Sequence, residues 1–186
     1  DGAMGSRGAL LLEPYNDDPG NRGLNVQPPD TILWWTRSAL SRGFQVGTHA
    51  IGDRANRIVL DIYEQAMRET GKQDARLRME HAQLVSPADL PRFASLGVIA
   101  SMQPTHATSD MPWVEQRVGA ERLRGAYAWR TLLSSGAVLA FGSDFPVESV
   151  NPLFGLYAAV TRQDAEGKPA GGWYPDQRLS LDEALR

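Results

Sequence analysis

The sequence predicts an α/β fold with a parallel sheet, organised as half of a (β/α)8 barrel of the TIM type. Short apolar runs alternate with longer segments whose apolar residues recur at helical spacing, a pattern typical of βα units. Three of the four short runs end in or just before a polar residue, namely His49, His81 and Asp144. The intervals between these three residues match the repeat length of a barrel.

These intervals are 32 positions from His49 to His81 and 63 positions from His81 to Asp144. A (β/α)8 barrel of roughly 250 residues uses about 31 residues for each unit. The intervals therefore correspond to one unit and to two units, with a further strand between His81 and Asp144. Because four strands are too few to close a barrel, we expect half of one.

Strands are predicted at residues 44–49, 76–81, 98–103 and 137–141. Helices are predicted at residues 51–70, 88–96, 121–135, 152–162 and 181–186. Asp53 is expected to cap the first helix at its amino end, and Gly71 and Gly97 to follow the last turns of the first two. Residues 121–135 are expected to form one continuous helix that ends before Gly136.

Alternation along the strands predicts which side chains face the barrel interior. The expected interior residues are Leu77, Met79, Ile99, Val138 and Ala140. Half a barrel would leave this apolar face uncovered, together with two sheet edges at the strands of Phe44 and Val138. We therefore expect a homo-oligomer that covers these surfaces, or an excised part of a larger fold.

Composition excludes several classes of protein. The 186 residues are 42% hydrophobic and 22% charged, with a formal net charge of −3, so no basic surface for nucleic acid is expected. The absence of cysteine excludes disulfides, thiolate metal sites and cysteine nucleophiles. No apolar run approaches the roughly 18 residues of a membrane span, and no signal-peptide pattern is present. A cytoplasmic protein with a small-molecule substrate is expected.

His49, His81 and Asp144 predict a metal site. The carboxyl ends of parallel strands meet at one edge of the sheet, where α/β enzymes place their chemistry. Neutral imidazoles and a carboxylate, without thiolates, suit a divalent ion such as Zn²⁺. The alternative is that each histidine has an ordinary structural role in the core or in a loop.

Three further residues are candidates for substrate binding. His106 follows Gln103 by three positions in a predicted loop at the same edge, where it would contact the substrate or handle a proton. The alternative for His106 is an ordinary loop histidine. Gln103 and Arg7 are candidates by position, although a charged residue such as Arg7 more often has a structural role.

Several motifs together resemble metal-dependent amidohydrolases, in particular the amidohydrolase 3 group of deacetylase-like and formamide-deformylase-like proteins. They are His-Ala-Ile-Gly-Asp at 49–53, Met-Glu-His-Ala-Gln at 79–83, Gln-Pro-Thr-His-Ala at 103–107 and Gly-Ser-Asp-Phe-Pro-Val-Glu at 142–148. The opening segment, residues 1–7, resembles the loop that follows barrel strand 4 in this group. The resemblance extends over almost the whole chain.

The resemblance implies a (β/α)8 barrel with metal ligands on strands 1, 4, 5, 6 and 8. His49, His81 and Asp144 match the positions on strands 5, 6 and 8. Residues 1–43 then correspond to the loop after strand 4 and the following helix, and residues 44–186 to strands 5 to 8 with their helices, without a β-sandwich segment. The histidine pair of strand 1 and the bridging group of strand 4 have no counterpart in this sequence. We therefore expect the isolated chain to have little or no activity.

The resemblance also implies a mechanism, the hydrolysis of a non-peptide C–N amide-type bond by a metal-activated water. Asp144 would take the proton of that water and pass it to the leaving nitrogen. Two alternatives remain open at this point. The chain could be a catalytically inactive, metal-binding half-barrel fragment, or it could belong to another metal-dependent barrel hydrolase, such as a phosphotriesterase-like enzyme.

Overall fold

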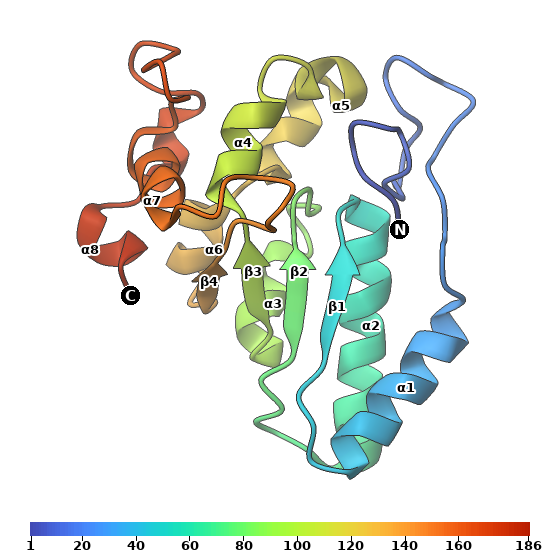
Figure 1. Cartoon of the computed structure of the whole chain (residues 1–186). Helices are drawn as coiled ribbons and strands as arrows, with labels where there is room; N and C mark the ends of the chain where they lie inside the picture. Colours follow the sequence, from blue (N-terminus) through green and yellow to red (C-terminus); the bar gives the residue numbers. More distant parts are fainter.

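A four-stranded parallel sheet lies at the centre of the protein, and Figure 1 shows it in a computed structural model of residues 1–186. The strands β1 (Gly47–Ala50), β2 (Arg78–His81), β3 (Ile99–Met102) and β4 (Leu139–Phe141) lie side by side in chain order. All three neighbouring pairs are parallel, so the four carboxyl ends lie along one edge of the sheet. The predicted α/β class with a parallel sheet is confirmed, and each strand is shorter than predicted.

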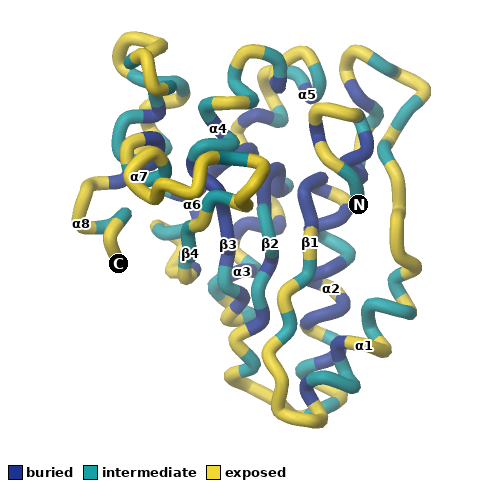
Figure 2. Tube along the Cα trace, viewed as in Figure 1, coloured by how far each residue is buried: buried dark blue, intermediate teal, exposed yellow.

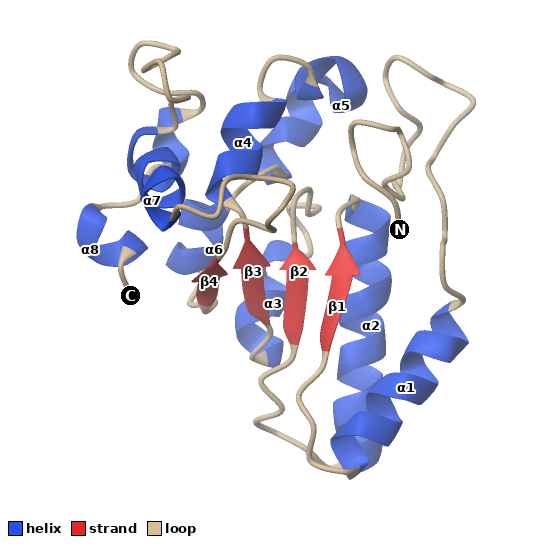
Figure 3. Cartoon of the chain, in the orientation of Figure 1, coloured by secondary structure: helices blue, strands red, loops and turns tan.

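Eight α-helices accompany the sheet (Figure 3). They are α1 (Pro29–Ser41), α2 (Asp53–Thr70), α3 (Leu90–Leu96), α4 (Pro104–Asp110), α5 (Val114–Arg122), α6 (Trp129–Ser134), α7 (Pro152–Thr161) and α8 (Leu181–Ala184). Short 3₁₀ turns cover Leu123–Gly125 and Pro175–Gln177. Helices α2, α3 and α6 lie behind the sheet in the view of Figure 1, and the near face of the strands carries no helix. No helix of the chain is both long and apolar enough to cross a membrane.

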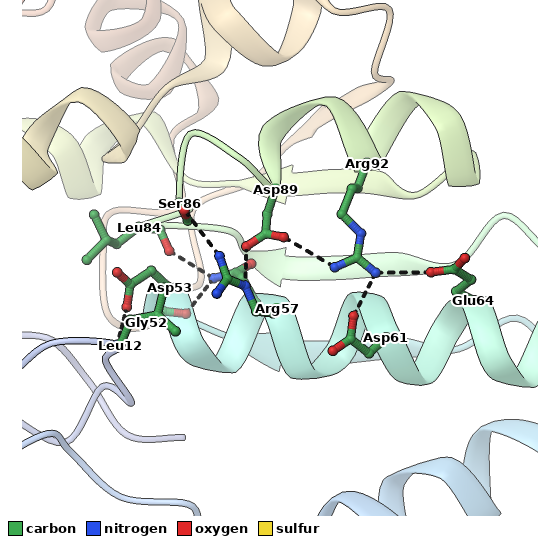
Figure 4. A network of polar contacts seen from close by, with 11 residues as sticks. Leu12, Gly52, Asp53, Arg57, Asp61, Glu64, Leu84, Ser86, Asp89 and Arg92 are labelled. Carbon is green, nitrogen blue, oxygen red and sulfur yellow. Dashed lines mark hydrogen bonds and ion pairs between the residues drawn. The ribbon is translucent and has the colours of Figure 1, made fainter.

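The longest helix, α2, forms where the sequence predicts it. Its buried residues recur at helical spacing, including Val59, Ile62 and Ala66, and Gly71 follows it in the left-handed conformation with φ 68°. The predicted N-cap is wrong, because Gly52 occupies that position. Asp53 instead accepts a hydrogen bond from the backbone N–H of Leu12 at 2.8 Å (Figure 4). The carboxylate therefore ties the amino-terminal segment to α2 instead of capping the helix.

Ion pairs join α2 to the start of α3 (Figure 4). The Arg57 guanidinium lies 2.8 Å from the carboxylate of Asp89, which is almost fully buried. Arg92 binds Asp61 and Glu64 of α2 at 2.7 and 3.2 Å. These contacts fix the crossover between β2 and β3 against the helix that follows β1.

The core lies between the sheet and the helices behind it, where Figure 2 shows the buried residues of β1 to β3. Leu77 and Met79 belong to this core, with 1% and 0% of their surface exposed. Both were expected in the barrel interior, and that expectation is wrong. The opposite face of β2 carries Arg78 and Glu80, whose side chains bind each other at 2.8 Å. Val138, by contrast, is 59% exposed.

The predicted helix over residues 121–135 is also wrong, because the chain leaves the helical conformation between α5 and α6. Gly125 and Tyr127 pair with the segment after β2: Val85 N–H donates to Gly125 O at 2.9 Å, and Tyr127 N–H donates to Gln83 O at 2.8 Å. A Cβ on Gly125 would lie 1.8 Å from the carbonyl oxygen of Val85, so only glycine allows this approach. Tertiary pairing here outweighs the local helical pattern.

Candidate metal centre

His49 and His81 lie next to each other at the carboxyl ends of β1 and β2. Their ring centroids are 4.6 Å apart, at an interplanar angle of 73°. In the sheet His49 pairs with Glu80, and His81 pairs with Ala50, so regular strands would place the two rings on opposite faces. His81 and Ala82 instead have positive φ values of 77° and 42°. This turn at the end of β2 breaks the alternation and brings the ring of His81 beside that of His49.

Gln103 fixes the orientation of His81. Nδ1 of His81 lies 2.8 Å from Oε1 of Gln103, while Nε2 of the same amide donates to the carbonyl oxygen of Ser101 at 3.4 Å. Because the amide nitrogen is used by Ser101, the amide oxygen faces the imidazole and accepts the proton of Nδ1. Nε2 of His81 then carries the free lone pair. Burial lowers the pKa of His81, which favours this neutral form.

His106 lies in the first turn of α4, and the expectation of a loop at this residue is wrong. Pro104 starts this helix directly after β3, and helices often begin with proline. Nδ1 of His106 lies 3.2 Å from Oε1 of Glu148, and Nε2 lies 3.6 Å from Oδ2 of Asp144. Its ring stacks with that of His81, at a centroid distance of 5.9 Å and an angle of 15°.

Asp144 comes from the segment after β4, which passes over the carboxyl ends of β3 and β2 in Figure 1. Its φ of 54° lies in the left-handed region, and its carbonyl oxygen accepts a hydrogen bond from Val147 N–H at 2.8 Å. One ligand atom each from His81, His106 and Asp144 lies within 4.8 Å of the other two. The structure thus brings together three of the residues singled out in the sequence.

His49 is not part of this three-residue cluster, although its ring lies against His81. Its Nε2 lies 3.3 Å from Oδ1 of Asp1, whose side chain is 1% exposed. The Asp1 carboxylate also accepts hydrogen bonds from the backbone N–H groups of Leu10, Ile51 and Gly52 at 2.8 to 3.0 Å. Asp1 therefore anchors both the amino-terminal loop and the turn after β1. Burial lowers the pKa of His49.

The side-chain contacts of Arg7 are with Asp17 and not with the cluster. Its guanidinium donates to both carboxylate oxygens of Asp17, at 3.1 and 2.9 Å. Arg117 also binds Asp17 and so closes a small ion-pair network on the surface. The contacts of Arg7 are those of a residue that holds the amino-terminal loop in shape.

A buried network lies beside the cluster and joins β2 to α4. Nε2 of Gln83 donates to Oδ2 of Asp110 at 2.7 Å and contacts the hydroxyl of Tyr127 at 2.9 Å. The hydroxyl of Tyr127 donates to the same carboxylate oxygen. Burial raises the pKa of Asp110 to about 6. Asp110 is four residues after His106, so the network fixes the helix that carries this histidine.

Sequence reasoning missed Asp1, Asp110, Tyr127 and the contact role of Glu148. A helix starting at Pro104 would have placed His106 and Asp110 on one face, since residues four apart are neighbours on a helix. Glu148 stands four residues after Asp144, in the same motif at residues 142–148. No pattern in the sequence marks Asp1, because three of its four contacts, those with His49, Ile51 and Gly52, come from a segment distant in the chain.

The donor set fits a divalent cation. It consists of two imidazoles and one carboxylate, and Nδ1 of each imidazole is bonded to an oxygen, which leaves Nε2 for a ligand. Histidines that bind metals ordinarily donate their other ring N–H to a carboxylate, a carbonyl or water. Nitrogen and oxygen donors without thiolate are those that Zn²⁺ takes in catalytic sites.

Enzymes built on parallel α/β barrels carry their active sites at the carboxyl ends of the strands, which is where two histidines and an aspartate converge in this protein. A family model described as Amidohydrolase family (Amidohydro_3) matches residues 1–186, and the chain belongs to this family.

Two curated relatives cover most or all of the chain. Protein LONG AFTER FAR-RED 3 of Arabidopsis thaliana is 41% identical over 186 residues, which are 100% of this chain and 32% of the relative. N-substituted formamide deformylase of Arthrobacter pascens is 32% identical over 149 residues, which are 77% of this chain and 26% of the relative. The chain thus spans about a third or less of the length of each relative.

Among solved structures, the chain is similar to an uncharacterized metal-dependent hydrolase from Pyrococcus furiosus. The TM-score is 0.85 with 39% identity, and the match covers 100% of this chain and 36% of that structure. The fold of this chain is therefore that of part of this metal-dependent hydrolase.

Proposed function

We propose that the chain supplies the carboxyl-terminal half of the active site of a metal-dependent hydrolase that cleaves non-peptide C–N bonds. The observation that carries the proposal is that His81 converges with His106 and Asp144 at the carboxyl-end edge of the sheet, and that the ring of His49 lies beside that of His81. The name of the formamide deformylase and that of the family favour a C–N bond as the target. The family match also favours this function over a phosphotriesterase-like one.

The proposal includes the half-barrel. Four consecutive strands without a strand outside β1 or β4 fit strands 5 to 8 of a (β/α)8 barrel. A hollow of about 560 Å³ lies along β4 and is lined by Leu139 and Phe141, and another of about 300 Å³ lies along β1 and is lined by Gly47 and His49. Further strands could pair at both positions. Residues 1–43 would then precede strand 5 as the loop after strand 4 and its helix.

In this proposal His49, His81 and Asp144 hold the metal ion, for which the donor set favours Zn²⁺. When bound, the ion would supply a water of lowered pKa and would polarise the scissile carbonyl. The Asp144 side chain is 41% exposed, so one of its oxygens can take a proton from the attacking water. The same carboxyl then passes the proton to the leaving nitrogen. Gln103 holds the ring of His81, and a small amide-type substrate would approach from the open side of Asp144.

The test uses the gene product that contains this chain at its natural length, loaded with Zn²⁺. N-formyl and N-acetyl amino compounds serve as substrates, and release of formate or acetate is measured. We expect turnover that is lost on chelation and reduced at least about 10³-fold in Asp144→Asn, which keeps the size of the side chain but cannot act as a base. Turnover that survives both changes would contradict the proposal.

A further inference from the structure

We propose that Asp1 is a positioning residue for His49, whose imidazole its carboxylate holds in one tautomer and one orientation. The inference rests on the proposed function, in which His49 is one of the residues that hold the metal ion. Asp1 itself contacts neither the ion nor the substrate and acts only through the histidine ring.

The Asp1 carboxylate is buried and receives hydrogen bonds on both of its oxygens. The side chain is 1% exposed. Oδ2 accepts from the backbone N–H groups of Leu10 and Gly52, both at 2.8 Å, and Oδ1 accepts from that of Ile51 at 3.0 Å. Because three backbone donors converge on it, the carboxylate acts as an acceptor, and the backbone around it fixes its position.

The fourth contact of the carboxylate is with His49. Nε2 of the ring lies 3.3 Å from Oδ1 of Asp1, slightly farther than in an ordinary N–H···O hydrogen bond. A carboxylate that faces a ring nitrogen favours the tautomer with the proton on that nitrogen, and the attraction is stronger at a buried carboxylate than in water. In the neutral ring Nδ1 then carries the lone pair. The His49 ring also meets the ring of His81 edge to face, with the centroids 4.6 Å apart, so both neighbours limit its rotation.

The fold places the carboxylate where backbone donors are free. Gly52 is the N-cap of α2, and the N–H groups at the start of a helix have no partner within it. The partial positive charge of the helix start also favours a carboxylate there. A Cβ on Gly52 would lie 2.0 Å from the carbonyl oxygen of Leu10, so the amino-terminal segment packs directly against the turn after β1. His49 lies two residues before Ile51, so one carboxylate holds both the turn that follows the histidine and the histidine ring.

A residue that only anchored the backbone would need no more than the three N–H contacts, so the test observes the His49 ring itself. In protein labelled with ¹⁵N at its three histidines, ¹H–¹⁵N spectra recorded without metal show which ring nitrogen is protonated and how strongly that proton is hydrogen-bonded. His49→Gln assigns the signal. We expect the His49 proton on Nε2, with the downfield shift and slow solvent exchange of a proton held by a carboxylate. Both features should be lost in Asp1→Ala, and Asp1→Asn, which keeps one acceptor oxygen, should retain part of them.

Asp53→Ala is the matched control. The Asp53 carboxylate is also buried and also holds the amino-terminal segment on α2, through the N–H of Leu12 at 2.8 Å, but it forms no hydrogen bond or ion pair with a histidine. Its removal loosens the same segment, so the His49 signal should stay as in the wild type. An equal change of that signal in Asp53→Ala and Asp1→Ala would overturn the inference, because loosening of the segment would then explain both.

Zn²⁺ affinity, measured by calorimetry, gives the second readout. We expect Asp1→Ala to weaken binding about 10- to 100-fold, the usual effect of removing the group that orients a ligating histidine. In a His49→Ala background the same change should weaken binding less than about 2-fold, because Asp1 then has no ring to hold. An equal loss in both backgrounds would show that Asp1 acts by another route and would also overturn the inference.

The two readouts separate this inference from the proposed function. If the wild type binds no Zn²⁺, the proposed function fails, while the spectra without metal still decide whether Asp1 holds the His49 ring. If the wild type binds Zn²⁺ but its His49 carries no Nε2 proton, or one that is unchanged in Asp1→Ala, the inference alone fails. Thermal unfolding identifies variants that do not fold. If Asp1→Ala is one of them, the wild-type spectrum and the partial loss expected in Asp1→Asn decide.

Discussion

Oε1 of Gln103 lies 2.8 Å from Nδ1 of His81, across the carboxyl ends of the two adjacent strands β2 and β3. The amide is almost fully buried, with 8% of the residue exposed, and its nitrogen is bonded to Ser101 O. The contact therefore selects one tautomer of His81 and fixes the plane of its ring. Gln103, predicted as a substrate-binding residue, has in the structure the contacts of a residue that orients a neighbouring histidine.

This relationship predicts that Gln103→Ala weakens Zn²⁺ binding about 10-fold, because His81 loses the acceptor that holds its ring. Gln103→Glu keeps an acceptor oxygen and should retain more of the affinity. Calorimetric titration of both variants measures the effect, with the unfolding temperature of the metal-free proteins as the control for folding. Equal affinities for the wild type and Gln103→Ala would contradict an orienting role.

The sequence predicts the strand ends well and the faces of the strands poorly. The positions of His49, His81 and Asp144 relative to the sheet follow from the strand–helix alternation, which local periodicity determines. The ring of His81 reaches His49 because His81 and Ala82 adopt positive φ values, and such values are uncommon in non-glycine residues. Strict alternation along β2 would place Leu77 and Met79 on the same face as His81. Because the turn redirects the His81 ring, that reasoning puts Leu77 and Met79 on the wrong face of the sheet.

The errors around α4 to α6 have a different cause. His106 and Gly125 lie in segments whose conformation depends on distant partners, Glu148 in one case and Val85 in the other. Local propensity is a weak prior when tertiary contacts of this kind compete with it. Pro104 at the start of α4 is the one local signal for this helix, because proline is common at the first helical position.

We expect the titration of the buried Asp110 carboxyl to make the stability of the protein depend on pH. Its pKa is raised from 3.8 to about 6 by burial, so the folded state binds the proton more tightly than the unfolded state. The stabilisation from the protonated carboxyl is fully present below pH 3.8 and is lost as the pH rises through 6. A difference of about two in the pKa between the unfolded and folded states corresponds to at most about 3 kcal/mol in the free energy of unfolding.

Asp110→Asn should therefore flatten the fall in the free energy of unfolding between about pH 4 and pH 6. Its amide oxygen can still accept from Tyr127 and Gln83. Urea unfolding at several pH values gives the slope, and Asp182→Asn on the exposed face of α8 is the matched control. An unchanged slope in Asp110→Asn would show that another group is responsible.

Position 52, at the start of α2, has no room for a side chain. A Cβ there would lie 2.0 Å from the carbonyl oxygen of Leu10, which is closer than any relaxed contact. Gly52→Ala must push the amino-terminal segment away from the helix and should destabilise the protein by about 2–3 kcal/mol. Gly20→Ala, where a Cβ meets nothing within 4 Å, should change stability by less than about 0.5 kcal/mol. Chemical denaturation compares the two, and equal effects would count against the close approach.

The isolated chain of 186 residues is predicted to have little or no hydrolase activity. Three donors can hold one metal ion with an open position, but the proposed half-barrel would enclose only one side of a substrate. Zn²⁺-loaded chain is assayed with N-formyl and N-acetyl amino acids against a longer homologous protein. Turnover of the isolated chain close to that of the longer protein, and abolished by Asp144→Asn, would refute this prediction.

We expect the protein to associate with itself through its two outer strands, β1 and β4. Phe44 before β1 and Val138 before β4 are 66% and 59% exposed, and both lie beside strands that have one unpaired edge. An exposed apolar strand edge is a template for pairing with another chain, and a charge on it prevents that pairing. We expect sedimentation velocity to show a mass that rises with concentration, and Val138→Lys to shift the protein toward the monomer. Leu24→Lys is the control, because Leu24 is 63% exposed but lies in an irregular segment. A compact monomer at micromolar concentration that unfolds cooperatively would show that these edges need no partner.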